Sequence, residues 1–306
     1  MSRIAIKVQA AILLVIIIFA SVGVYYFISN QWPITASIVI PAQTSTHTSS
    51  AQPMVQNDSN WAGYIIASDL QNPQPTVTSV KASWFVPEIT HFTNDSFSAV
   101  WIGIGGFFDE TLIQAGSEQD SINGEAVYSV WFELLPADAV TIDRINVSPG
   151  DKITASISLV NPDLDVWSIY LADSNDTQAF QNNFSYASSQ TSAEWIVERP
   201  VTNQNISILA NISTVTFTDC QATIKNQTGF ISSFPSVQSI MYQELRGTAG
   251  ITQLTYVSNL SNDGSIFTVN IYTSIPELPY WMVIPLLIGT FFAVIAVKKY
   301  HRRNRT

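Results

Sequence analysis

Two glutamates share one face of a β-rich run, Ser192-Ala193-Glu194-Trp195-Ile196-Val197-Glu198. Side chains alternate between the two faces of a strand, so Glu194 and Glu198 point one way while Trp195 points the other. A carboxylate held in this way can act as a general base that takes a proton from water. A strand with one solvated face shows the same pattern, because exposed glutamates opposite a buried tryptophan are ordinary there. Other segments must decide between these two interpretations.

A second run places an aromatic side chain beside a carboxylate. Residues 126–135 alternate, and the apolar side chains on one face suit a packed core: Tyr128, Val130, Phe132 and Leu134. The opposite face presents Ser129, Trp131 and Glu133. Such a face is typical of a ligand groove, although a surface strand with a half-exposed tryptophan would show the same residues.

Cysteine and histidine are too few for several other kinds of site. Cys220 is the single cysteine, which rules out an intrachain disulfide, a thiolate metal cluster and a redox pair. The three histidines, His47, His91 and His301, are scattered, so a histidine-based metal site is not expected. Neither His47 nor His91 has a nucleophile-elbow motif to serve. We therefore expect no metal and no cofactor.

Both ends of the chain contain long apolar segments. Val8–Ile28 has few polar residues and Pro279–Val297 has no charge, so each is long enough to cross a bilayer as a helix. Basic residues precede the first and follow the second, which places both termini in the cytoplasm by the positive-inside rule. We predict a signal-anchor transmembrane segment in residues 1–30 and a transmembrane helix with a basic cytoplasmic tail in residues 275–306. A signal peptide cleaved near residues 20–23 is the alternative for the first.

The region between these segments is strongly acidic. It holds all 23 acidic residues and six of the 13 basic ones, a formal charge of −17 at pH 7, so nucleic acid is not an expected partner. It also contains many Asn-x-Ser/Thr acceptors for N-glycans, at Asn57, Asn94, Asn146, Asn175, Asn183, Asn205, Asn211, Asn226 and Asn259. These features predict a glycosylated domain on the outer side of the cell membrane.

The composition changes once more within this outer region. Residues 31–58 are rich in Ser, Thr, Pro, Gln and Ala, which predicts a flexible stalk. From residue 59 to 274, short β-rich runs alternate with turn residues; the clearest strands are 61–67, 77–86, 98–104, 111–115, 126–135, 152–160, 166–172, 193–197, 213–224 and 266–274. The pattern predicts an all-β domain, an antiparallel two-sheet β-sandwich of the concanavalin-like or jelly-roll type, flanked by the two transmembrane helices.

Seven short segments match one protein family in order and approximate spacing: residues 59–64, 82–87, 101–106, 112–116, 131–136, 149–151 and 193–198. Together they resemble the glutamic peptidases, or eqolisins, first known as acid proteases of fungi. The match runs from Ser59 to about Ile224 and more loosely to 267–270. The resemblance implies a β-sandwich of two curved antiparallel sheets, in agreement with the strand pattern.

The resemblance also implies a catalytic pair, Gln114 and Glu198. It makes Glu194 a supporting or solvent-facing acid. The positions expected to bind substrate are Asn60, Trp61, Trp101, Glu118 and Glu133, to which the alternation of residues 126–135 adds Trp131.

Two residues depart from the family's pattern. Gly105 stands where fungal members have an aspartate beside the cleft, and Arg199 follows the catalytic glutamate where an acid is usual. Strand alternation turns Arg199 to the opposite face. The fungal disulfides are absent as well. None of these changes removes Gln114 or Glu198.

These features predict an extracellular, membrane-anchored acid endopeptidase that acts on proteins or peptides. Hydrolysis without a metal or a covalent nucleophile needs a base for water and a neutral donor for the oxyanion, which a glutamate and an amide supply. A Glu198 with an ordinary pKa of about 4.3, beside largely protonated Glu118 and Glu133, implies an acidic optimum. Two other functions stay open: a non-catalytic β-sandwich that binds peptide or glycan, and a structural cell-surface protein.

Overall fold

The computed structural model describes residues 53–92, 94–174, 179–202, 204–244 and 250–272. This part of the chain consists of strands and two short 3₁₀ turns, η1 (Pro162–Leu164) and η2 (Ile231–Ser233). The strands are β1 (Met54–Asp58), β2 (Trp61–Ala67), β3 (Val77–Phe85), β4 (Ala99–Gly105), β5 (Leu112–Ile122), β6 (Glu125–Leu134), β7 (Val140–Thr141), β8 (Lys152–Asn161), β9 (Val166–Asp173), β10 (Ala179–Ser185), β11 (Ser192–Glu198), β12 (Val201–Thr202), β13 (Asn205–Ile206), β14 (Val215–Ile224), β15 (Gln227–Phe230), β16 (Ser236–Glu244), β17 (Ile251–Gln253), β18 (Thr255–Val257) and β19 (Phe267–Ile271).

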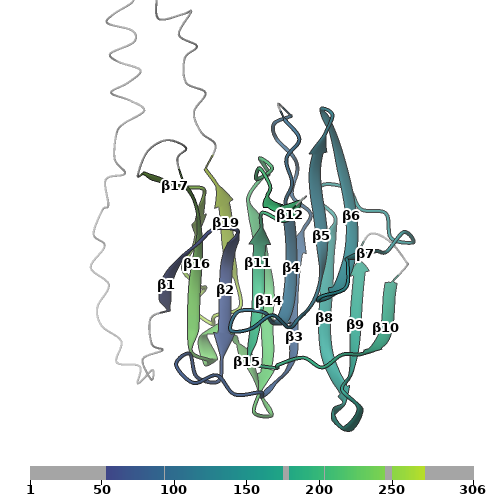
Figure 1. The fold of residues 1–306 in the computed structure, drawn as a ribbon, viewed down its shortest axis with the longest axis vertical. Helices are drawn as coiled ribbons and strands as arrows, with labels where there is room; N and C mark the ends of the chain where they lie inside the picture. Colours follow the sequence, from purple (N-terminus) through teal and green to yellow (C-terminus); the bar gives the residue numbers. More distant parts are fainter. Residues whose placement is uncertain (1–52, 93, 175–178, 203, 245–249, 273–306) are drawn as a thin grey trace, which may run out of the picture. The chain divides into compact units, whose positions relative to one another are not determined.

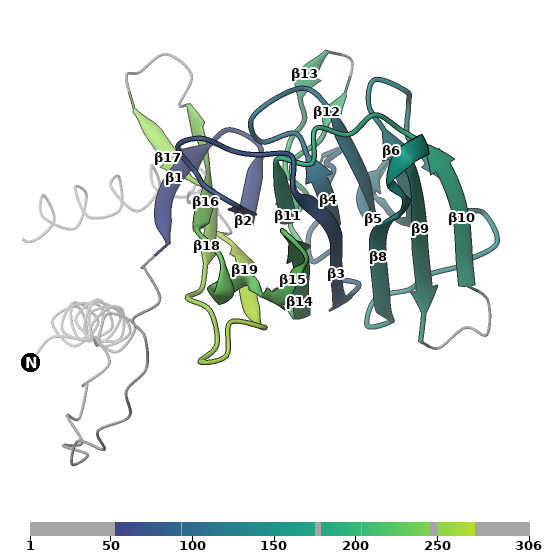
Figure 2. The same ribbon diagram turned by 90° about the horizontal axis from the view of Figure 1, so that it is seen from below.

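Two sheets form the two layers of a sandwich (Figure 1). The nine-stranded sheet has the order β1-β16-β2-β11-β4-β5-β6-β7, with β17 paired to β16. The eight-stranded sheet has the order β10-β9-β8-β3-β14-β19-β18, with β15 paired to β14. Figure 2 shows the layers end-on, with the hairpin β12–β13 on the side of the nine-stranded sheet that faces away from the other sheet. The predicted all-β sandwich is confirmed.

Large aromatic side chains fill the space between the sheets. Trp84, Trp167 and Trp195 are fully buried there, and Phe217 stacks on Phe267 with ring centroids 4.8 Å apart. Burying rings of this size removes much apolar surface from water, which is the main favourable term in folding. The alternation of strand side chains leaves the outer face of the nine-stranded sheet available for a site.

The predicted faces of strand β6 are correct. Val130 and Phe132 lie in the core between the sheets, while Trp131 and Glu133 point to the outer face. Trp131 is only 7% exposed, so the alternative of a half-exposed surface tryptophan is wrong. Every other predicted strand also overlaps an observed one.

Strand β1 corrects the predicted stalk, because residues 54–58 belong to the sheet. β1 pairs with β16 in parallel, from Met54 opposite Val237 to Asp58 opposite Met241. All other strand pairs are antiparallel. The rest of the predicted stalk, and the apolar segments 8–28 and 279–297, lie outside the described residues. In the part that the structure describes, no helix is long and apolar enough to cross a membrane.

Strand β16 was not predicted, because polar residues occupy buried positions in it. Gln238 and Ser239 are buried on opposite faces of the strand. The Gln238 amide nitrogen lies 3.1 Å from the Tyr64 hydroxyl and 3.0 Å from the Val257 carbonyl. A buried strand is predicted from its apolar residues. In β16 hydrogen bonds from a polar side chain replace part of the apolar contacts.

We expect Gln238→Leu to lower the free energy of unfolding by about 1–3 kcal/mol, because the buried Val257 carbonyl loses a donor. Chemical denaturation followed by fluorescence measures the change. Gln227→Leu, at an exposed position of β15, is the matched control and should change stability by less than about 0.5 kcal/mol. Equal effects of the two substitutions would contradict the role of the Gln238 amide.

Candidate active site

A cavity of about 620 Å³ lies on the outer face of the nine-stranded sheet. It is lined by seven of the residues that the sequence analysis selected: Asn60, Trp61, Gln114, Glu118, Trp131, Glu133 and Glu198. The eighth, Trp101, is fully buried and reaches the site through a hydrogen bond. Residues from β2, β5, β6 and β11 are therefore brought together as expected, although their individual roles stay predictions.

Two N–H groups hold the carboxylate of Glu198 at the wall of this cavity. Asn60 Nδ2 donates to Oε1 at 3.1 Å, and Trp101 Nε1 donates to Oε2 at 2.7 Å. Burial, with a smaller contribution from the charge of Glu133, raises the pKa of Glu198 to about 7. Hydrogen bonds from Trp101, Trp61 and Asn60 oppose that rise because they favour the charged form.

The Trp101 indole can reach Glu198 because two glycines leave room beside it. Gly116 pairs with Trp101 on the neighbouring strand, and a Cβ there would stand 2.6 Å from the Trp101 Cβ. A Cβ on Gly103 would stand 2.8 Å from the indole ring. On the other side, Trp61 packs edge-on against Trp101 with ring centroids 5.0 Å apart. The orientation of the donor is thus fixed by packing.

Gln114 and Glu133 form a second polar pair in the cavity. The Gln114 Nε2 donates to Glu133 Oε2 at 2.5 Å, while the Gln114 Oε1 has no partner among the described residues. Burial raises the pKa of Glu133, and the hydrogen bond from Gln114 lowers it in part. A side-chain amide has two N–H hydrogens, so one of them remains for a ligand in the cavity.

Two further carboxyl groups follow Gln114 on the same face of β5. Burial raises the pKa of Glu118, and burial together with the charge of Glu118 raises the pKa of Asp120 to about 8. No lysine, arginine or histidine is among the described residues that line the cavity. The neutral form is therefore favoured for Glu118, Asp120 and Glu133 to a higher pH than for ordinary carboxyl groups. No group of three His, Cys, Asp or Glu side chains in the described part could hold a metal ion.

Glu194 is a buried acid, so the solvent-facing alternative of its predicted role is wrong and the supporting role stays a prediction. Its exposure is 0%. Burial raises its pKa well above the ordinary value of 4.5, the Ser192 hydroxyl opposes the rise in part, and the charge of Asp109 adds to it. Alternation placed Glu194 on the correct face of β11, but it could not show that the chain covers this part of the face.

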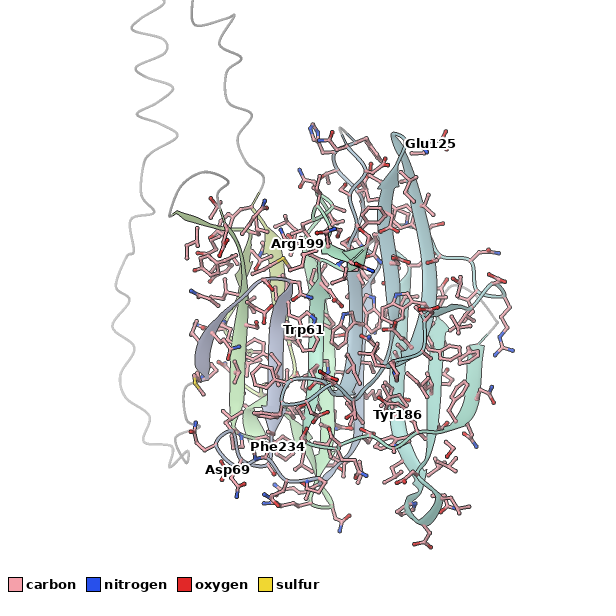
Figure 3. The ribbon with its side chains drawn as sticks, viewed as in Figure 1. Trp61, Asp69, Glu125, Tyr186, Arg199 and Phe234 are labelled. Carbon is pink, nitrogen blue, oxygen red and sulfur yellow. The ribbon has the colours of Figure 1, made fainter. Side chains whose placement is uncertain are left out.

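The two departures from the family pattern have structural reasons. Gly105 has a φ of +87°, and a Cβ at this position would stand 2.3 Å from the Thr111 carbonyl oxygen. An aspartate would therefore be strained here, whatever its charge could offer. Arg199 does not line the cavity; its Nη1 donates to Gln243 at 3.2 Å, and burial lowers its pKa. Figure 3 labels Arg199 and Trp61.

The sequence analysis missed several residues that shape the cavity. Asp58 lines it from the end of β1, which was assigned to the stalk. Tyr186, labelled in Figure 3, accepts from the Leu112 backbone N–H at 2.7 Å and donates to the Leu135 carbonyl at 2.9 Å, and both leucines line the cavity. No local pattern marks such a long-range contact.

The matching family model, described as the Peptidase A4 family, covers residues 59–266. The chain belongs to the Peptidase A4 family. The resemblance to the glutamic peptidases is confirmed by this match.

Several relatives of this Peptidase A4 chain are known. Aspergillopepsin-2 of Aspergillus niger is 25% identical over an alignment of 187 positions that covers 54% of this chain and 64% of that protein. The solved structure of scytalido-glutamic peptidase with a transition state analog inhibitor has a TM-score of 0.57 at 22% identity. SCP-B, a member of the eqolisin family in complex with the tripeptide Ala-Ile-His, has a TM-score of 0.52 at 21% identity. Each of the two solved structures matches 70% of this chain over 99% of its own length, and the match shows a shared fold.

We expect Glu194→Gln to protect the fold against rising pH. A buried acid with a raised pKa stabilises the fold below its unfolded pKa, and this contribution is lost as pH rises towards its folded pKa, at about 1.4 kcal/mol per pH unit. The variant cannot ionise, so its advantage over the wild type in urea denaturation should be larger at pH 7 than at pH 4. The exposed Glu125→Gln is the control. A pH dependence equal to that of the wild type would contradict a protonated Glu194.

Proposed function

We propose that this chain is an endopeptidase that hydrolyses peptide bonds in proteins through a water activated by Glu198 and Gln114. The observation that carries the proposal is the Glu198 carboxylate, fixed by two N–H donors at the wall of a cavity that Gln114 also lines. Membership of the Peptidase A4 family supports the same reaction.

In the proposed reaction, ionised Glu198 takes a proton from a water molecule, and the resulting hydroxide adds to the scissile carbonyl carbon. The negative charge moves to the carbonyl oxygen, where the free N–H of Gln114 stabilises it. Protonated Glu198 then gives its proton to the amide nitrogen as the C–N bond breaks. The products are a carboxylic acid and an amine, and Glu198 returns to its ionised form.

The raised pKa of Glu198 changes the pH range expected from the sequence. With a pKa of about 7, the ionised base is a minor species at pH 2–5, so kcat/KM should rise about tenfold per pH unit below 7. Above that point Asp120, whose pKa is about 8, loses its proton and adds negative charge beside Glu118. The proposed optimum therefore lies at mildly acidic to neutral pH.

Glu198→Gln and Gln114→Ala should each lower kcat/KM on an unfolded protein substrate by about 10²–10⁴-fold, since one removes the base and the other the oxyanion donor. Initial rates between pH 2 and 8 give the measurement, and Glu125→Gln, exposed and outside the cavity, is the control. Substantial hydrolysis by either purified variant would contradict the assignment of Glu198 as the base or of Gln114 as the oxyanion donor. A wild-type rate that is constant below pH 5 and falls through 7 would instead identify protonated Glu198 as the reactive form.

A second function is favoured by the tryptophans of the cavity. Trp61 and Trp131 line it together, and aromatic walls suit the binding of peptide or glycan without turnover. Glu198→Gln separates the two functions: for a peptidase it should bind a peptide that the wild type cleaves. A wild type that binds peptide and cleaves none between pH 2 and 8 would favour the binding protein.

We further propose that this domain is held on the outer face of the cell membrane by the two apolar segments, with both termini in the cytoplasm and N-glycans on the domain. The charge of −17 between the segments and the basic residues beyond them support this topology. The described acceptor asparagines other than Asn211 are exposed, as glycan attachment requires.

The full chain should remain in membranes after an alkaline carbonate wash, because apolar helices of this length are not released by high pH. A chain that ends at residue 274 and lacks residues 1–30 should instead appear in the soluble fraction. Treatment of the full chain with an N-glycosidase should lower its mass. Release of the full chain by carbonate would contradict the proposed anchors.

A further inference from the structure

Asp58 holds the turn that carries two residues to Glu198. Its Oδ1 accepts from the backbone N–H groups of Asn60 and Trp61, each at 2.9 Å. A carboxylate that accepts two successive backbone N–H groups fixes the conformation of a tight turn, as in an Asx turn. The Asp58 side chain therefore holds one side of the turn 58–61 in place.

The same turn is held on its far side by the sheet. The Asn60 carbonyl accepts from the Arg199 backbone N–H at 2.9 Å, next to Glu198 in the chain. The Trp61 carbonyl accepts from the Ser239 hydroxyl at 3.1 Å. These bonds set the distance between the turn and the end of β11, but they leave the direction of the Asn60 side chain to the conformation of the turn itself.

Two contacts to the catalytic centre depend on that conformation. The Asn60 amide donates to Glu198 Oε1, and the Trp61 ring packs edge-on against Trp101, which donates to Oε2. These two donors thus depend on the turn, Asn60 directly and Trp101 through ring packing, and Trp61 itself also favours the ionised form of Glu198. Asp58 has its own place fixed by the parallel pairing of β1 with β16.

We propose that Asp58 is a positioning residue for Glu198: its carboxylate holds the turn 58–61 so that the Asn60 amide stays on Glu198 Oε1. This inference rests on the proposed function, since it gives Asp58 a part in the same reaction. Asp58 acts through Asn60 and does not itself exchange a proton with the substrate.

The proposal makes a prediction with a definite sign. The Asn60 hydrogen bond favours the ionised form of Glu198, so its loss raises the pKa of Glu198 further above its ordinary value. Removing the negative charge of Asp58 by itself would act in the opposite direction, because a nearby anion disfavours ionisation. An upward shift on removal of Asp58 therefore reports the lost hydrogen bond and not the lost charge.

The experiment is a ¹³C NMR titration of the glutamate carboxyl groups in the full chain, with Glu198→Gln used to assign the Glu198 signal. Asp58→Ala and Asn60→Ala should each raise the pKa of Glu198 by about one unit. The double variant should shift it no further than Asn60→Ala does. Asp58→Asn keeps an oxygen acceptor at the same place and removes only the charge, so it should leave the pKa of Glu198 at or below the wild-type value. Asp58→Glu keeps the charge but moves the carboxylate away from the turn, so it should also raise the pKa of Glu198. This variant replaces Asp58→Ala if that variant does not fold.

Three outcomes would overturn the proposal: no shift in Asp58→Ala and Asp58→Glu, a downward shift in Asp58→Ala that Asp58→Asn reproduces, or additive shifts in the double variant. The pH profile of kcat/KM, measured on the same variants, should move its acid limb by the same amount as the NMR titration. A wild type without peptidase activity would refute the proposed function and leave the NMR test of Asp58 intact.

Discussion

A single carboxylate, partly buried at the cavity wall and held by N–H donors, constrains most of this structure. An ionisable group can be buried at a wall of the sheet only if its charge, when present, is compensated by hydrogen bonds. For Glu198 the donors come from both sides, Asn60 at the start of β2 and Trp101 in β4. The large indole then requires small neighbours, which Gly103 and Gly116 supply. The need to satisfy one carboxylate thus determines residue sizes on two strands, β4 and β5.

The described lining of the cavity holds no cation. Protonation of the acids in and beneath the cavity therefore affects both the stability of the fold and the proposed activity. Glu118, Glu133 and Asp120 have raised pKa values because they are buried close to one another, and Glu194 beneath the same face is raised by burial. As pH rises, the acids around the cavity ionise and repel one another, and Glu194 gains a charge in the protein interior. Arg199 could have relieved this repulsion, but its side chain bonds to Gln243 instead.

The sequence predicts the strands that carry a clear apolar pattern. β2 was predicted with its observed bounds because it is a nearly continuous apolar run, and the faces of β6 were correct because apolar residues occupy every second position. β5 was predicted too short, since Ser117 and Gln119 occupy core positions; the Ser117 hydroxyl accepts from the Trp84 indole at 2.9 Å inside the sandwich. Alternation shows which side chains share a face, and it cannot show that a buried polar residue has found a partner.

The site residues were predictable for a related reason, and their environment was not. Resemblance supplied Gln114 and Glu198, and alternation placed Glu198 on the correct face of its strand. What covers a face, however, depends on contacts between segments distant in the sequence, and burial is what raises the pKa of Glu198 and hides Glu194. Asp58 was not predicted because its contacts are two hydrogen bonds to backbone N–H groups, and residue types do not reveal such bonds.

The register of the nine-stranded sheet explains why the family motifs must be ordered and spaced as they are. One row across the sheet reads Gly63, Ile196, Trp101, Gly116, Trp131, so Gly116 lies between two tryptophans and Gly63 lies beside Ile196. A Cβ on Gly63 would stand 2.0 Å from the Trp195 carbonyl oxygen, so no larger residue fits there. A slip of one residue in any strand would turn its row member into the core and separate the glycines from their large neighbours. Each strand contributes one residue to this row, so only one register assembles it.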